Sequence, residues 1–105
     1  MLTKIHETEE RKIISLCDED LIGKKFETKD LQLDVSEFFY KGENLDEKKV
    51  LEEIEGASSL NIVGKDSIKF ALKHNLISKT HIIKIQNIPH ALAVVEWLLN
   101  FVLNV

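Results

Sequence analysis

The central part of the chain, residues 46–85, alternates between helical and strand patterns, and this alternation constrains the fold more than any other feature. Residues 46–55 and 65–75 carry apolar side chains at helical spacing, with charged residues on the remaining faces. Residues 60–63 and 81–85 are short apolar runs rich in β-branched side chains, which favour strands. We therefore predict a strand–helix–strand unit whose two strands form a parallel pair.

The first 45 residues indicate short antiparallel strands. Leu2–Thr8 and Arg11–Cys17 are separated by a polar pair, which predicts a hairpin. Further short elements are predicted as a helical turn ending at Gly23, strands over 25–27 and 31–35, and a helix over 37–41 that ends at Gly42. The predicted class is α/β (or α+β), with antiparallel N-terminal strands followed by helices, in one domain over residues 1–105.

The C-terminal 15 residues, 91–105, are apolar apart from three positions. Glu96, Asn100 and Asn104 are spaced by four and would form one narrow stripe on a helix. We predict a helix over residues 96–105, while a strand stays open for the preceding residues. Such a helix is expected to pack on the body with one side and on a second copy with the other. Attachment to a membrane surface is the alternative. The interface candidates are Trp97, Leu98, Phe101 and Val102.

Charge is distributed unevenly along the chain, whose net charge is −4. Residues 1–55 hold 16 acidic and 9 basic side chains, a net of −7, and residues 56–105 hold 2 and 5, a net of +3. This split indicates a basic contact surface, unless the two halves mix in three dimensions. One cysteine excludes an internal disulfide, and neither a signal peptide nor a membrane-spanning run is visible. We expect a cytoplasmic protein.

Four stretches carry a family resemblance: CDEDLIGK at 17–24, LDVSEFFYKG at 33–42, NIVG at 61–64 and IPHA at 88–91. In their order and spacing they resemble the small archaeal family catalogued as domain of unknown function 424, over roughly residues 2–95. The resemblance implies an archaeal cytoplasmic protein of about this length. It brings no established activity, so no functional residue is carried over. Family members end soon after the Pro-His-Ala motif, whereas this chain continues into the apolar tail.

Lysines in the second half are the clearest binding candidates. Lys65, Lys69 and Lys73 recur every four residues and should lie on one exposed face of a helix, with His74, Lys79, His81 and Lys84 nearby. Gly64-Lys65 sits where a strand feeds this helix, so backbone N–H groups there could bind a phosphate. The glycine-bracketed loop of a P-loop is missing. The alternatives are an ordinary turn glycine and a merely solvated helix face.

Two other reactive side chains, His90 and Cys17, are weaker functional candidates. His90 follows Pro89 in a turn-like setting and could act as a base, or it could simply tie down a turn. Cys17 precedes three acidic residues, which disfavour its thiolate, so we expect it to be buried and to react slowly. No catalytic set, cofactor motif or metal-ligand spacing is predicted.

Two functions follow as hypotheses. The first is a non-enzymatic binding or accessory protein that contacts RNA, a ribonucleoprotein or an acidic partner through its basic C-terminal half. The second is a small enzyme or a nucleotide- or phosphate-binding domain with its site near Gly64, Lys65 and His90. The sequence leaves open whether the chain is an enzyme.

Overall fold

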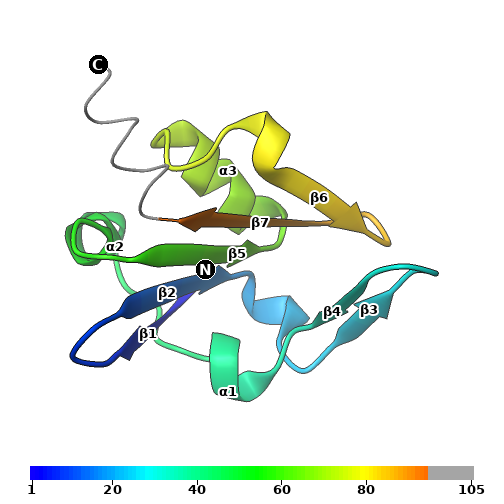
Figure 1. The fold of residues 1–105 in the computed structure, drawn as a ribbon, viewed down its shortest axis with the longest axis horizontal. Helices are drawn as coiled ribbons and strands as arrows, with labels where there is room; N and C mark the ends of the chain where they lie inside the picture. The colour runs from blue at the N-terminus through cyan, green and yellow to red at the C-terminus, as the bar shows by residue number, and fades with distance from the viewer. Residues whose placement is uncertain (95–105) are drawn as a thin grey trace.

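The computed structural model describes residues 1–94, which adopt a mixed α+β fold, as predicted. Five strands form one sheet in the order β1-β2-β5-β7-β6, and β3 and β4 form a separate two-stranded ribbon (Figure 1). The strands are β1 (Leu2–Glu7), β2 (Lys12–Cys17), β3 (Lys25–Glu27), β4 (Gln32–Asp34), β5 (Ser59–Val63), β6 (Ile82–Ile85) and β7 (Ile88–Val94). The helices are α1 (Glu37–Tyr40), α2 (Glu47–Ile54) and α3 (Lys65–Lys73), with 3-10 turns η1 (Glu19–Leu21) and η2 (Lys79–His81).

The N-terminal hairpin is confirmed. Strands β1 and β2 pair antiparallel from Leu2 opposite Cys17 to Glu7 opposite Lys12. The turn closes with a hydrogen bond from the Thr8 N–H to the Arg11 carbonyl at 2.8 Å. Strands β3 and β4 form a second, shorter antiparallel pair.

The strand–helix–strand unit β5–α3–β6 is also confirmed, but its two strands are not neighbours. Strand β7 lies between them and is antiparallel to both, so β5 and β6 run in the same direction without pairing. The parallel pair in this sheet is instead β2 with β5. The prediction of a direct β5–β6 pair was wrong because β7, for whose later residues the sequence leaves a strand open, inserts between the two.

The physical reason is a tight turn at Gln86 and Asn87. Both residues have positive φ, 52° and 67°, which is the backbone shape of a two-residue hairpin loop. The sequence interpretation placed the turn at Pro89 and His90, yet these residues belong to β7. Pro89 has no N–H to donate, but its carbonyl accepts a hydrogen bond from the Gly64 N–H at 2.9 Å. Strand β7 thus returns through the middle of the sheet.

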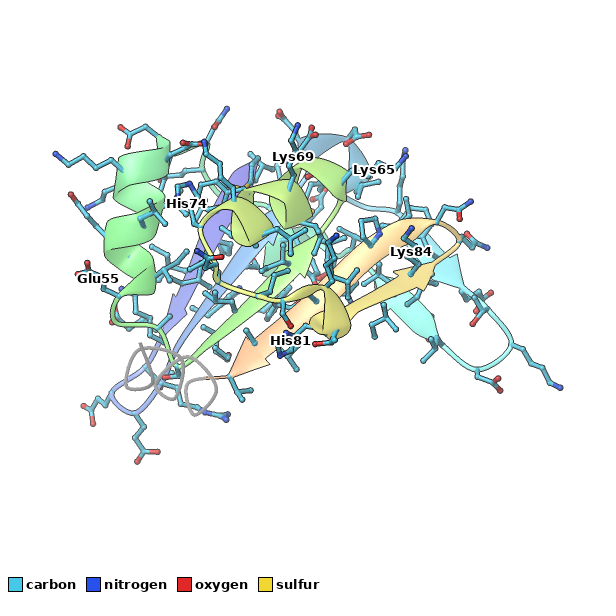
Figure 2. All side chains as sticks on the ribbon, turned by 90° about the horizontal axis from the view of Figure 1, so that it is seen from above. Glu55, Lys65, Lys69, His74, His81 and Lys84 are labelled. Carbon is cyan, nitrogen blue, oxygen red and sulfur yellow. The ribbon has the colours of Figure 1, made fainter. Side chains whose placement is uncertain are left out.

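The sheet has two unlike faces. Helices α2 and α3 lie on the same side of it, here called the helical face (Figure 2). Its core consists of Ile14, Leu16, Val50, Ile54, Ala57, Leu60, Ile62, Ile68, Phe70, Ala71, Ile77, Ala91 and Ala93. On the opposite face, α1 and the β3–β4 ribbon pack over a second cluster that includes Cys17, Val63 and Ile85. Because side chains alternate along each strand, every central strand contributes to both clusters.

The predicted C-terminal helix over residues 96–105 lies outside the described residues, and so do all four interface candidates within it. No helix within residues 1–94 is long and apolar enough to cross a membrane.

Candidate anion-binding groove

Helix α3 begins at the edge where β2 and β5 both end. Gly64 precedes the helix with φ of 107°, a backbone conformation that favours glycine. Asp18 follows β2, and because β2 and β5 are parallel neighbours, Asp18 lies beside Gly64. The Asp18 carboxylate accepts hydrogen bonds from the N–H groups of Asp66 at 3.1 Å and Ser67 at 2.8 Å, and from Ser67 Oγ at 2.7 Å. The positive end of α3 is therefore occupied by the chain's own carboxylate.

The backbone at Gly64 is engaged as well, since its N–H donates to the Pro89 carbonyl. An external anion at this helix end would have to displace Asp18. The cationic groups that remain available near Gly64 are lysine side chains on α3, beginning with Lys65.

These lysines border a groove between α3 and the edge strand β6. Lys65 and Lys69 come from α3, and Lys84 comes from β6 (Figure 2). All three side chains are exposed. The space between them is a cavity of about 350 Å³, and its remaining lining residues are Ile68, Leu72, Ile82, Asn87 and Pro89. We call this cavity with its three ammonium groups the lysine groove.

The helix predicted around Lys65, Lys69 and Lys73 is confirmed, and all three lysines are exposed. They do not share one environment, however. Lys73 Nζ lies 3.7 Å from Glu47 Oε2 of α2. Within residues 1–94, Lys65, Lys69 and Lys84 form no ion pair. The lysine groove therefore concentrates positive charge that the described part of the chain does not neutralise.

His90 lies elsewhere. It projects from β7 on the same face as its β6 partner Ile83, whereas Pro89 and Lys84 pair on the helical face. The structure therefore brings Lys65 and Lys69 together with Lys84, and it does not bring His90 to them. The predicted turn-like setting of His90 is replaced by a position inside a strand.

A small polar cluster surrounds His90 on the opposite face. Asn61 Oδ1 accepts two hydrogen bonds, one from the Tyr40 hydroxyl at 2.8 Å and one from His90 Nε2 at 3.0 Å. Because this acceptor fixes the proton on Nε2, the neutral ring keeps its lone pair on Nδ1. Burial lowers the pKa of His90 and favours this neutral form. Sequence inspection did not single out Asn61 or Tyr40 as site residues, although both lie in stretches that carry the family resemblance, 61–64 and 33–42.

Cys17 is fully buried, as predicted. Burial raises its pKa to about 12, with further contributions from the carboxylates of Asp18 and Asp20. A thiol in this state is a poor nucleophile. Within residues 1–94 no group of three or more His, Cys, Asp or Glu side chains is placed to hold a metal ion.

The described residues thus form a mixed α+β fold with a groove lined by Lys65, Lys69 and Lys84 beside its edge strand. The chain belongs to the DUF424 family, described as proteins of unknown function, whose model matches residues 6–95. The family resemblance seen in the sequence is thereby confirmed.

A solved structure supports the fold. The crystal structure of an uncharacterized conserved protein from Methanopyrus kandleri is similar over 88% of each chain, with 27% sequence identity and a TM-score of 0.74. A comparison with curated proteins finds no match for this chain. Neither description names a ligand or a reaction.

Proposed function

We propose that the protein is a non-enzymatic RNA-binding or accessory protein whose lysine groove contacts phosphate groups. The observation that carries this proposal is that three lysines with no ion pair within residues 1–94, Lys65, Lys69 and Lys84, line one cavity. A bound polyanion would attract all three like charges at once. Release of counterions from the polyanion adds to the affinity at low salt.

The lining of the groove favours contact with the backbone of a nucleic acid over reading of its bases. Its apolar residues, such as Ile68, Leu72 and Ile82, are aliphatic, and no aromatic side chain lines it among the described residues. Base stacking on a protein surface requires aromatic side chains or arginine planes. The groove would therefore bind RNA with little sequence preference. A ribonucleoprotein or an acidic protein surface carries similar negative charge and is the alternative partner if RNA alone does not bind.

The test compares two variants of equal charge. Lys65, Lys69 and Lys84 are replaced by Ala in one variant, and in the control the exposed Lys24, Lys25 and Lys29 are replaced by Ala. Binding to a short single-stranded RNA is measured by fluorescence anisotropy at low and physiological salt. Loss of the groove lysines should weaken binding about tenfold at low salt, while the control should retain most of its affinity. Equal losses in both variants would mean that net charge alone, and not the groove, binds the RNA.

A small phosphorylated ligand is the second candidate, because a cavity of about 350 Å³ falls within the size range of small-molecule sites. Saturable thermal stabilisation by a nucleotide or by inorganic phosphate would favour it, since a ligand of the native state raises the melting temperature. That stabilisation should disappear in the variant that lacks Lys65, Lys69 and Lys84. His90 is not expected to contribute, since it lies on the other face of the sheet.

Two further elements belong to the proposal. A cytoplasmic location fits an RNA-binding role and a single buried cysteine without a disulfide partner.

Self-association through residues 96–105 stays a prediction. Measuring the solution mass of the intact chain and of a chain truncated before residue 96 tests it. A monomeric intact chain at high concentration would contradict it.

A further inference from the structure

The opposite face of the sheet is only partly covered by described residues. Around α1 and the β3–β4 ribbon its side chains are buried, but the ends of β6 and β7 that are far from the ribbon are not. There Ile83, Leu92 and Val94 are 48%, 54% and 47% exposed. They stand on one face, because Ile83 pairs with His90, and Leu92 and Val94 follow at alternate positions of β7. We call these three side chains the open patch.

Polar atoms lie beside the open patch. Asn61 is the cross-strand partner of Leu92, and His90 is two residues before it. The Asn61 amide nitrogen and His90 Nδ1 have no hydrogen-bond partner within residues 1–94. The patch thus offers an apolar surface with one donor group and one acceptor next to it.

The open patch is too small to hold a second copy by itself. Three half-exposed aliphatic side chains provide only about 200 Å² of apolar surface. A standard interface buries about 800 Å² on each partner. A short segment of the same chain is a better match, since covalent linkage gives it an effective concentration in the millimolar range.

Such a segment begins directly at the patch. Val94 is the last described residue, and 11 residues follow it, of which all but Glu96, Asn100 and Asn104 are apolar. From Val94 back to His90, the open patch and the polar group beside it extend along four residues of β7, about 13 Å. Ten residues in a helix span about 15 Å. The segment therefore has the length, composition and point of attachment that the patch requires.

We propose that residues 96–105 pack in the same chain on the open patch of Ile83, Leu92 and Val94, with the polar stripe of the segment meeting Asn61 and His90. This inference is independent of the lysine groove, which lies on the other face. The open patch is the surface on which the body-facing side of the segment would pack. This packing requires no second copy.

Trp97 is the sole tryptophan and reports on this contact in the full-length protein. Its emission should be blue-shifted and protected from acrylamide at low protein concentration. Replacing Ile83 and Leu92 by Thr, which retains β-branched or strand-compatible shapes, should at least double the quenching constant. The control is Leu31→Thr at a leucine beside the β3–β4 ribbon that is 43% exposed, and it should leave quenching unchanged.

A second measurement needs no variant. Nuclear Overhauser effects should connect the Trp97 ring with methyl groups of Leu92 or Ile83, and they should persist within single chains in a mixture of labelled and unlabelled protein. Three results would overturn the inference: a solvent-exposed Trp97 in the wild type, contacts that occur only between different chains, and protection that appears only when lipid vesicles are added. Protection that survives the double substitution with the fold intact would place the segment elsewhere and overturn it as well.

Discussion

Asp18 and Ser67 lie 49 residues apart in the sequence and share two hydrogen bonds, from the Ser67 N–H at 2.8 Å and from Ser67 Oγ at 2.7 Å, both to Asp18 Oδ1. This pair joins the end of β2 to the first turn of α3. It anchors the helix that carries Lys65 and Lys69, and so it fixes one wall of the lysine groove. The charge of the groove depends on lysines, but its geometry depends on Asp18.

Replacing Asp18 by Ala should therefore destabilise the protein. The substitution removes a helix cap and leaves the Ser67 hydroxyl, which is buried, without its acceptor. We expect the free energy of unfolding to fall by about 2 kcal/mol. Urea denaturation measures the change. Glu52→Ala on the exposed side of α2 is the control and should stay within about 0.5 kcal/mol of the wild type.

Gly64→Ala tests the same junction from the other side. A Cβ at this position would collide with the Asp18 carboxylate, and φ of 107° is unfavourable for any side chain. The expected loss is about 2 kcal/mol or more. Gly56→Ala is the matched control, because a Cβ there meets no atom closer than 3.8 Å. A Gly64→Ala protein as stable as the Gly56→Ala protein would show that the junction is looser than described.

Alkaline pH should weaken the fold. Burial raises the pKa of Cys17 and of Tyr40 to about 12 each, so the folded state holds these protons more tightly than the unfolded state does. Stability is therefore fully present below the unfolded pKa values, about 9 and 10, and declines as pH rises toward 12. Denaturation midpoints between pH 8 and pH 11 measure the decline. Thiol reagents should label Cys17 at pH 8 only as fast as the protein unfolds, and rapid labelling of the folded protein would contradict this account.

Mild acid should also weaken the fold, through His90. Burial lowers its pKa in the folded state, so the unfolded chain binds the proton more readily. Stability from this residue is present above the unfolded pKa of about 6.5 and is lost as pH falls through the folded value. Proton NMR should show His90 titrating below the ordinary range. Titration at or above about 6.5 would mean that the ring is more open to water than its position on β7 indicates.

The elements that the sequence predicted well are those with local signals. Helices α2 and α3 each have a clear hydrophobic period, and the β1–β2 hairpin is marked by a polar pair between two strand-forming runs. The cap of α2 is also local, because the Asp46 carboxylate accepts from the Lys49 N–H at 2.8 Å. The cap of α3 has no such signal, because Asp18 lies 48 residues before Asp66. It becomes visible only when β2 and β5 are known to be parallel neighbours.

The start of strand β7 was missed for a related reason, although the sequence leaves a strand open over residues 91–95. Its turn, at Gln86 and Asn87, lacks the Asn-Gly or Asp-Gly pair that marks most two-residue hairpins, and Pro89 suggested a turn in its place. The predicted grouping of the lysines was incomplete for the same reason. Spacing on a helix grouped Lys73 with Lys65 and Lys69, whereas tertiary structure pairs Lys73 with Glu47 and brings Lys84 beside the other two. Which charges meet across elements is a property of the sheet order, which periodicity does not specify.

Mapping of a bound RNA onto the protein tests the central claim most directly. A short single-stranded RNA is titrated into isotopically labelled protein, and backbone and lysine side-chain chemical shifts are followed by NMR. The largest changes should fall on Lys65, Lys69 and Lys84, and raising the salt concentration should reverse them. Changes centred on the β3–β4 ribbon or on the open patch, or no changes at low salt, would contradict the proposal that the lysine groove binds phosphate groups.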